Sequence, residues 1–388
     1  MTADAETGES LSARLGFPET AVEVGFAHPA VRHVMTGVGG SASFLVHLDD
    51  DRITELEVDI GLGHRGFERE CEDTDWASAL PYVSRLGFAS GVMAETAWCL
   101  ALESLAGIAL PDRAIWGRML VNELARIADH FARLGAVMQA IGLSEGALAA
   151  QRGEAVAMLT LAAATGDAPL AGFVVPGGVA RGLEGELVDD WAERRALIDA
   201  ELVAFDRIAV ANPTVVRRLR GVAELSADDA IAWGVTGPAL RASGAPVDLR
   251  RDRPYLAYGA LDFDVPVGER GDDLDRLLVV VEEIRQSLRM VDQIHKLLVS
   301  LGPGESRAGA ADSLVLAEGE GVASVEASTG ELGFLLASDG DGPPRRVRCR
   351  APSFFHAQAL PAMLVGARLD DLLPTAALLH IVGAECDR

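Results

Sequence analysis

Apolar residues recur at intervals of three and four over five long stretches of this chain, and this spacing predicts amphipathic helices. The stretches are 76–107, 112–141, 144–165, 183–210 and 272–301. In the first stretch a long apolar helix opens near Gly91. Pro111 separates it from the second stretch, where Asp112 is placed to cap the helix. The sequence therefore predicts a fold with a helical core.

Shorter segments near both ends of the chain have the composition and spacing of strands. They are residues 42–47 and 53–60, on either side of the turn 49–51, and residues 322–327, 331–338 and 345–350. A last helix is expected from about Leu369. Together these elements predict a mainly α fold with small flanking β-sheets, of the α+β class.

The changes of pattern divide the chain into four regions. They are an acidic lead over residues 1–22, a β-hairpin region over 23–60, a helical core over 61–310, and a C-terminal sheet and helix over 311–388 that close on the core. Inside the core, the Gly-, Pro- and Arg-rich range 234–271 shows little periodicity. Such long stretches within a compact domain are usually functional or packed against something, so we expect this one to be buried.

Two groups of charged residues favour a structural interpretation. The first consists of Asp248, Arg250, Arg251, Asp252 and Arg253. Ion pairs that anchor the range 234–271 are favoured there over an anion-binding site. The second consists of Glu282, Glu283, Arg285 and Arg289, whose spacing on one helix predicts an ordinary charged face.

The composition bounds the class of protein. The 388 residues are 49% hydrophobic and 24% charged, which suffices for a sizeable core in a soluble globular protein. The formal net charge of -24 opposes binding to nucleic acid or anionic lipid, since both need a basic surface. We find no signal-peptide pattern and no apolar run of the ~18 residues that a membrane span needs, so a link to a membrane is expected only through partners.

Two further features predict little chemistry. Cys71, Cys99, Cys349 and Cys386 lie far apart without a CxxC pair, so neither a disulfide framework nor a zinc site is predicted and a reducing compartment is expected. The glycine run 37–40 has neither a strand before it nor a helix directly after it, which predicts a turn rather than a phosphate loop.

Candidate chemistry gathers at the front of the segment 61–110. A turn-like entry and the residues just before the apolar helix hold His64, Arg65, Glu68, Glu70, Pro81, Tyr82 and Arg85. Polar side chains are therefore expected to collect where that helix begins. A pocket-lining role and a structural role fit His64 and Arg65 about equally well.

Ten motifs run in order from His64 to the C-terminus. They are HRGFE at 64–68, LPYVSR at 80–85, NELARIADHFARLG at 122–135, LRASG at 240–244, DLRRDRPY at 248–255, DFDVPVGERGD at 262–272, EEIRQSLR at 282–289, STGELGFLLASDG at 328–340, RCRAPSF at 348–354, and the terminal Asp387-Arg388. In these motifs and their order the chain resembles the D-type subunit of bacterial NADH-quinone oxidoreductase. That protein is the large peripheral-arm subunit of respiratory complex I and is related to the large subunit of nickel–iron hydrogenases.

The resemblance implies the hydrogenase large-subunit fold, packed on a small iron–sulfur subunit next to the membrane. It implies that this chain is one subunit of an electron-transfer complex like NADH-quinone oxidoreductase. The complete complex, rather than this chain alone, would bind both NAD and quinone. This chain would line a quinone pocket beside an iron–sulfur cluster held by the partner, would bind no cofactor itself, and would not be active alone. The implied place is cytoplasmic, at the cytoplasmic face of the inner membrane as a peripheral subunit among the other complex I-like subunits.

The resemblance also implies where a quinone would bind. In quinone-reducing members a His on the N-terminal hairpin loop and a Tyr three residues after the Arg of the LPY…R motif bind the quinone head group. An Asp on the following helix pairs with that His. Arg85 matches the family's Arg, but Phe88 stands at the Tyr position and cannot donate a proton. The Asp position falls on Ala140, or on Gln139 if the register slips by one.

The ligand histidine has no single counterpart. The family pattern GPQHPSTHG is only echoed by residues 25–33, where His28 and His33 are substitutes if they are not simply loop residues; counting back from HRGFE gives Gly39 instead. A further family His, before the xRPGG motif, appears as Leu170, and Val175 replaces that motif's Arg. The quinone-pocket candidates are therefore His28, His33, His64, Arg65, Arg85 and Phe88, and no catalytic residue is assigned.

The hydrogenase relationship can be tested on the same motifs, because a nickel–iron site needs four thiolates from two CxxC pairs. Those positions are Gly87, Ser90, Val382 and Glu385, so no metal is expected, and Cys386 is interpreted as a small buried hydrophobe. A non-catalytic scaffold that keeps the partner interface is the alternative function. A hydrogenase-related complex with another acceptor ranks third. The sequence leaves open the electron donor, the acceptor and the assembly of the chain.

Overall fold

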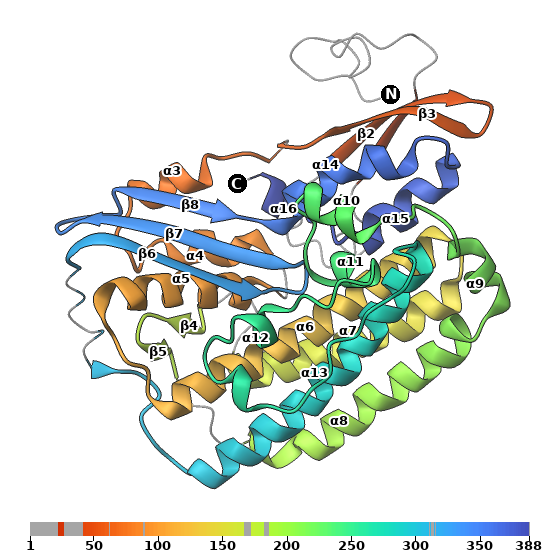
Figure 1. Cartoon of the computed structure of the whole chain (residues 1–388). Helices are drawn as coiled ribbons and strands as arrows, with labels where there is room; N and C mark the ends of the chain where they lie inside the picture. The colour runs from red at the N-terminus through yellow and green to blue at the C-terminus, as the bar shows by residue number, and fades with distance from the viewer. Residues whose placement is uncertain are drawn as a thin grey trace.

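Five long helices form the centre of the computed structural model (Figure 1). They are α5 (Gly91–Ala106), α6 (Asp112–Ala140), α7 (Ser144–Thr165), α8 (Glu186–Phe205) and α13 (Asp273–Leu301). The structure describes residues 22–26, 42–61, 63–87, 90–166, 172–181, 186–309, 311, 314 and 316–387, with the backbone alone for 22–26 and 186–189. The predicted mainly helical α+β fold is confirmed.

Helix α6 is the central helix, because α7 packs against one side of it and α13 against another. Its predicted apolar positions are all buried, namely Leu120, Leu124, Ile127, Phe131 and Leu134. Sequence spacing placed this helix correctly. The predicted cap is wrong, however: Pro111 is the N-cap residue, and the side chain of Asp112 lies within the first turn, where its charge favours the positive end of the helix dipole.

A three-stranded antiparallel sheet near the N-terminus covers the C-terminal helices. It consists of β1 (Val22–Phe26), β2 (Ala42–Asp49) and β3 (Arg52–Asp59), and it packs on α14 (Pro352–Leu364) and α15 (Leu372–Leu378). The N–H of Ile53 donates to the carbonyl of Ala367 at 2.9 Å, and the N–H of Gly366 donates back to the carbonyl of Ile53 at 2.7 Å. The two predicted strands of this region are therefore confirmed, and they are fixed to the other end of the chain.

The second three-stranded sheet has the order β6-β7-β8 and lies against α5 (Figure 1). Its strands are β6 (Glu318–Glu326), β7 (Glu331–Asp339) and β8 (Arg346–Arg350), as the sequence predicted to within a few residues. Helix and sheet approach closely at Gly321. A Cβ on Gly321 would lie 2.1 Å from the carbonyl oxygen of Ala101, which is far inside any normal contact.

Shorter elements connect these layers. They are α3 (Phe67–Glu72), α4 (Leu80–Val83), the 3-10 turn η1 (Ser84–Leu86), β4 (Val174–Val175), β5 (Gly178–Val179), the π-helical turn η2 (Asp206–Val210), α9 (Pro213–Leu219), α10 (Ala227–Ala232), α11 (Gly237–Ala242), α12 (Leu249–Asp252), the 3-10 turn η3 (Tyr258–Ala260), the 3-10 turn η5 (Leu369–Asp371) and α16 (Gly383–Cys386). No helix of the described residues has the length and apolar character needed to cross a bilayer.

The structure corrects the sequence prediction in three places. The stretch 76–107 is not one helix: it is interrupted before α5, where Gly87 is extended at φ -137° and ψ 167°. Helix α14 was missed, because it is apolar on most sides and contains Pro361, so it shows no amphipathic period. The range 234–271 is only partly buried, and it contains the short helices α11 and α12 and the turn η3.

We predict that Gly321→Ala lowers the free energy of unfolding by about 1–3 kcal/mol, since only a shift of α5 or β6 relieves an overpacked contact with a backbone carbonyl. Chemical denaturation of the full chain measures the effect. Gly309→Ala is the matched control, because a Cβ on Gly309 meets nothing within 4 Å. Equal stability of the two variants would show that α5 and β6 are not in close contact.

Candidate functional site

Three segments that are distant in sequence converge beside the first turn of α5. They are residues 63–66, residues 84–87 and residues 383–387, and together we call them the front face. The ring nitrogen Nδ1 of His64 lies 3.2 Å from the backbone carbonyl oxygen of Asp387. Helix α16 packs against η1, which carries Arg85. The two ends of the predicted central segment and the C-terminus therefore form one surface.

The front face carries two exposed arginines and an exposed histidine. His64, Arg65 and Arg85 are all exposed, and among the described residues Arg85 has no ion-pair or hydrogen-bond partner. Burial raises the pKa of Asp387, and the N–H groups of Gly63 and Gly61 and the nearby His64 and Arg65 offset this only in part. An unpaired guanidinium at a surface can bind a carbonyl or anionic group of a ligand or partner.

Several predicted positions cannot be placed. His28, His33, Phe88, Gly39, Leu170 and the glycine run 37–40 lie outside the described residues. Ala140 is the last residue of α6 and is half-buried, while Gln139 is exposed. Val175 lies in β4. The structure thus brings His64 and Arg65 close to the C-terminus and sets Arg85 beside α16, and the rest of the quinone pocket stays a prediction.

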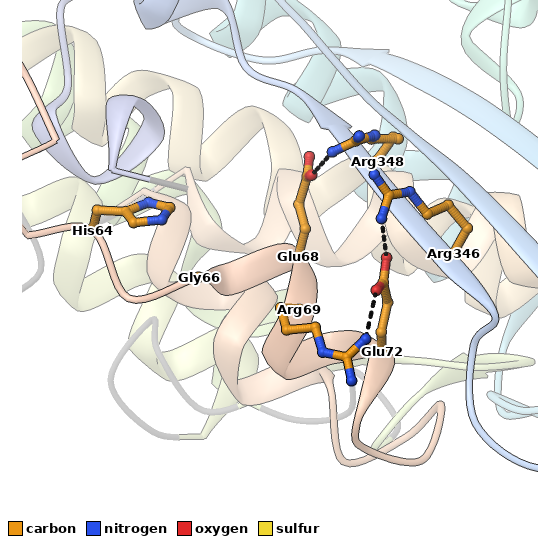
Figure 2. Close-up of a pocket in the computed structure, with 7 residues that line it drawn as sticks. All are labelled: His64, Gly66, Glu68, Arg69, Glu72, Arg346 and Arg348. Atoms are coloured by element: carbon orange, nitrogen blue, oxygen red, sulfur yellow. Dashed lines mark hydrogen bonds and ion pairs between the residues drawn. The ribbon is translucent and has the colours of Figure 1, made fainter.

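A polar pocket of about 290 Å³ lies next to the front face (Figure 2). It is lined by His64, Gly66, Glu68, Arg69, Glu72, Arg346 and Arg348. In Figure 2 the glutamates of α3 point to the arginines of β8, and His64 stands apart from these ion pairs. The five glutamates and arginines of this pocket are all engaged in ion pairs with one another, so none of them is free to bind a quinone carbonyl.

The two glutamates of this pocket have a structural role. Glu68 accepts a hydrogen bond from the N–H of Cys349 at 2.8 Å, and Glu72 accepts one from the N–H of Val347 at 3.1 Å. Both N–H groups belong to β8, which is an edge strand of its sheet. The glutamates one helical turn apart on α3 therefore satisfy donors that an edge strand would otherwise present to another chain.

The residues at the hydrogenase ligand positions do not fit a nickel–iron centre. None of Gly87, Ser90, Val382 and Glu385 supplies a thiolate, and a Cβ on Gly87 would lie 2.1 Å from the hydroxyl oxygen of Ser90. Within the described residues, no group of three or more His, Cys, Asp or Glu side chains is arranged to hold a metal ion. Cys386 is buried in the core cluster beneath the N-terminal sheet, as predicted.

Buried glutamate and arginine side chains hold the β4–β5 hairpin against α5 and α6. Arg118 forms a two-pronged ion pair with Glu103 at 2.8 and 2.5 Å and donates to the carbonyl of Gly178 at 3.0 Å. Glu103 in turn accepts from the N–H of Gly177 at 2.7 Å. The N–H of Val174 donates to Glu95 at 3.1 Å. The Pro-Gly-Gly turn is therefore fixed by side chains from two core helices.

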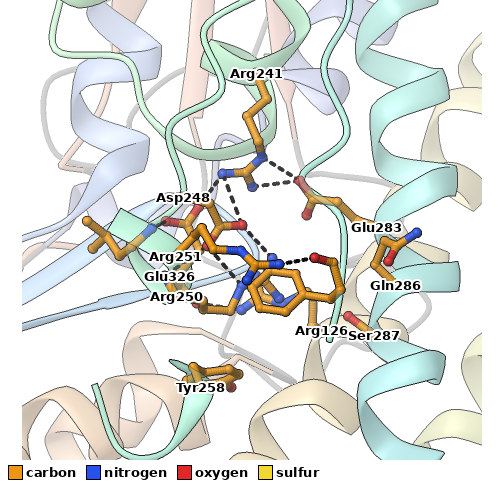
Figure 3. A network of polar contacts seen from close by, with 12 residues as sticks. Arg126, Arg241, Asp248, Arg250, Arg251, Tyr258, Glu283, Gln286, Ser287 and Glu326 are labelled. Carbon is orange, nitrogen blue, oxygen red and sulfur yellow. Dashed lines mark hydrogen bonds and ion pairs between the residues drawn. The ribbon is translucent and has the colours of Figure 1, made fainter. Parts of the chain in front are cut away.

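A second buried network anchors the range 234–271 to the helices (Figure 3). Glu123 of α6 accepts hydrogen bonds from Tyr258 at 2.7 Å, from Ser287 at 2.7 Å and from Arg250 at 3.1 Å. Burial works to raise the pKa of Glu123, but Arg126 and Arg250 outweigh it, and the net shift is downward. The predicted ion pairs of Arg250 are confirmed by its contact with Asp248 at 2.7 Å.

Arg241 extends this network to α13 and β6. It contacts Glu283 at 2.6 Å and Glu326 at 2.7 Å, and all three side chains are buried. Burial would raise the pKa of Glu283, yet Arg241 and the hydrogen bond from His130 lower it to about 2. The predicted ordinary charged face is therefore wrong for Glu283, which turns inward, while the neighbouring Arg285 and Glu282 do form a half-buried pair at 3.0 Å.

The sequence interpretation missed two further functional candidates, the buried carboxyl groups of Glu95 and Glu385. Glu385 was considered only as a lost thiolate position. A usable signal existed for Glu95: α5 is a 16-residue apolar helix with only two charged residues, Glu95 and Glu103. Charged residues on a helix with no polar face must find buried partners, and this marks them for attention.

Comparisons of the chain with known proteins all match subunits of respiratory complexes. The family profile described as "Respiratory-chain NADH dehydrogenase, 49 Kd subunit" matches residues 144–312 and 308–388. The chain is 34% identical over 407 aligned residues to the second D-type subunit of NADH-quinone oxidoreductase from Anaeromyxobacter sp. (strain Fw109-5), with 97% of this chain and 91% of the relative covered. The D-type subunit from Myxococcus xanthus (strain DK1622) is 34% identical over 412 residues, covering 99% and 97%.

A solved structure has the same arrangement of the chain. One polypeptide in the structure of the membrane-bound sulfane sulfur reductase, an archaeal respiratory membrane complex, superposes with a TM-score of 0.86 and 28% sequence identity. The match covers 96% of this chain and 100% of that polypeptide. The similarity therefore extends over the helical core and both sheets.

We predict that Arg250→Ala lowers the free energy of unfolding by about 3–5 kcal/mol, because it leaves the buried carboxylates of Glu123 and Asp248 short of a cation. Urea denaturation of the full chain measures this change. Arg253→Ala is the control: its side chain is 65% exposed, and its ion pair with Glu331 contributes at most about 1 kcal/mol. A small loss in both variants would mean that the buried network is not what fixes the range 234–271.

Proposed function

Because the chain belongs to the family of the 49-kDa subunit of respiratory-chain NADH dehydrogenase, we propose that its front face lines the quinone-binding site of such a complex. The chain is a component of a respiratory complex and is like the D-type subunit of complex I, and other subunits of that complex are its expected partners. The observation that carries the proposal is Arg85. It is exposed and unpaired among the described residues, and it matches the Arg of the family's quinone-site motif.

The chemistry of the front face supports a binding role more than a catalytic one. Arg85 can donate hydrogen bonds to a quinone carbonyl, and Arg65 adds positive charge on the same face. Electrons would come from an iron–sulfur cluster in the small partner subunit, because this chain has no CxxC pair to hold a cluster of its own. The partner would cover the front face and shield the reacting quinone from water.

A second acceptor is favoured by one comparison. The similar solved polypeptide belongs to a complex named a sulfane sulfur reductase, so a sulfane sulfur compound is the alternative substrate for the same surface. The family's tyrosine position is occupied by Phe88 in this sequence. This replacement fits a sulfane sulfur acceptor, because no phenol is needed to donate a hydrogen bond to a quinone carbonyl. A scaffold role without an acceptor is the remaining possibility to be tested.

The test is an activity assay on the assembled complex, purified through a tag on this chain after its iron–sulfur centres have been reduced chemically. Quinol formation from a short-chain quinone is measured beside sulfide formation from polysulfide. We expect quinol from the wild-type complex. Sulfide alone would establish the second candidate. If the complex forms neither product although its reduced iron–sulfur signals are intact, the chain has the scaffold role.

We predict that Arg85→Met weakens use of the quinone by roughly 10- to 100-fold in kcat/KM, the loss expected when one hydrogen bond from a charged group is removed. Arg69→Met is the matched control: its side chain is 71% exposed and it pairs only with residues of its own segment, Glu72 and Asp73. Unchanged kcat/KM in the Arg85 variant would place quinone binding elsewhere.

A further inference from the structure

Two buried glutamates have no cation within ion-pair distance among the described residues. Among the described residues, the buried glutamates Glu72, Glu103, Glu123, Glu283 and Glu326 each have an arginine nitrogen within 4.0 Å. Glu95 and Glu385 are as deeply buried, at 0% and 2% exposure, yet no ion pair reaches either of them in the part of the chain described. A buried carboxyl group without a cation is far more stable with its proton on.

The hydrogen bonds of Glu95 fit a protonated carboxyl group. One oxygen accepts from the N–H of Val174 at 3.1 Å, while the other, Oε1, is buried and has no partner among the described residues. Arg118, the nearest positive group, is already engaged by both oxygens of Glu103. Burial raises the pKa of Glu95 to about 8, although the N–H groups of Val174 and Gly172 and the charge of Arg118 work against the shift.

The partners of Glu385 are two hydroxyl groups and the backbone N–H of Ser353, which donates to the carboxyl group at 3.1 Å. Thr329 Oγ1 lies 2.8 Å from one oxygen, and Ser353 Oγ lies 2.5 Å from the other and 3.0 Å from the carbonyl oxygen of His380. Burial raises the pKa of Glu385 to about 7, the hydroxyls lower it in part, and Asp129 of α6 raises it; Arg133 on the same helix is the positive group that faces it.

The hydroxyl of Ser353 permits two arrangements of protons. When Glu385 is ionised, Ser353 donates its proton to the carboxylate. When Glu385 is protonated, the carboxylic O–H can donate to Ser353, whose own proton then turns to the carbonyl of His380. A single rotation of the Ser353 hydroxyl therefore keeps the hydrogen bonds of the site satisfied in both protonation states of Glu385.

Both glutamates lie on helices that reach the front face. Glu95 is four residues into α5, which begins at Gly91 beside η1, and Glu385 lies on α16, which packs against η1 directly. Arg85 is on η1, and both α5 and α16 contact that turn. The resemblance implies a Tyr and an Asp at the quinone site, and this sequence has Phe88 at the first position and Ala140, or Gln139 if the register slips by one, at the second.

We propose that Glu95 and Glu385 are the proton-holding residues of the front face and supply the protons for reduction of its acceptor. The inference rests on the proposed function. For a quinone, the partner's iron–sulfur cluster supplies two electrons, one at a time. Each carboxyl group breaks its O–H bond and passes its proton to the front face, where the two quinone oxygens each gain one O–H bond. The two carboxylates are then reprotonated from solvent.

The first test does not depend on activity. Infrared spectra of the full chain record the C=O stretch of protonated carboxyl groups, which carboxylates lack. We expect Glu95→Gln and Glu385→Gln each to remove one part of this band. In the wild-type chain, the part from Glu95 should disappear as the pH rises through about 8, and the part from Glu385 as it rises through about 7. Glu145→Gln, an exposed glutamate on α7, should leave the band unchanged. If the band is unchanged in both Glu95→Gln and Glu385→Gln, the proposal is overturned.

Protein stability gives a second readout of the same protons. The folded chain keeps a proton on Glu95 up to about pH 8, whereas the unfolded chain releases it near the ordinary value of 4.5. The stabilisation from this proton is therefore full below the unfolded pKa and is lost as the pH rises through the folded pKa. Glu95→Gln should flatten the fall in the free energy of unfolding over this range. An unchanged slope contradicts the assignment.

The third test uses the assembled complex with its iron–sulfur centres reduced. We expect each Gln variant to lower kcat for quinone on the order of 100-fold, the lower end of what a positioned proton donor contributes, with KM unchanged. Glu385→Asp should restore part of the rate, since it keeps the proton. Wild-type turnover in both Gln variants overturns the proposal. Absence of quinone turnover in the wild type overturns the proposed function, and the infrared result still decides whether the two residues hold protons.

Discussion

The fold depends on one constraint: charged side chains that lie inside a helical core must all be neutralised there. Glu123 shows how this works, because its single carboxylate receives donors from α6, α12, η3 and α13. A stretch with little regular structure, residues 234–271, is held in one conformation by these contacts rather than by a hydrophobic period of its own. Removing one of the charged side chains leaves its oppositely charged partner unpaired in a medium of low dielectric constant.

The sequence was informative where the pattern of apolar residues reflects the packing. Helices α6, α7 and α13 have one apolar stripe each, and their ends were predicted within a residue or two. Periodicity fails for α14, because apolar residues lie on its half-buried positions as well as on its buried face and the sequence therefore shows no period. It also fails at Glu283, since nothing in the spacing of charges shows which member of a helical face turns inward to meet Arg241.

The candidate site was predictable only in part, because some of its residues are marked by a sequence motif and others only by their neighbours in space. Motif resemblance identified Arg85, and the structure sets it beside α16 at the front face. The importance of Glu95 and Glu385 comes from what is missing around them, and the absence of a cation is a property of three-dimensional neighbours. Ser353 and Thr329, which contact Glu385, are 32 and 56 residues away from it in the chain. No local pattern connects them.

The capping of β8 by Glu68 and Glu72 has a consequence for the synthesis of this protein. The capped N–H groups lie 281 and 275 residues further along the chain than the glutamates that satisfy them, and Asp387 reaches His64 across 323 residues. The N-terminal third therefore leaves the ribosome long before its partners exist, and its closing contacts are of very high contact order. Until the last residues emerge, α3 lacks β8 and the N-terminal sheet lacks α14 and α15, so a chaperone or an early-binding neighbour would have most to protect during that interval.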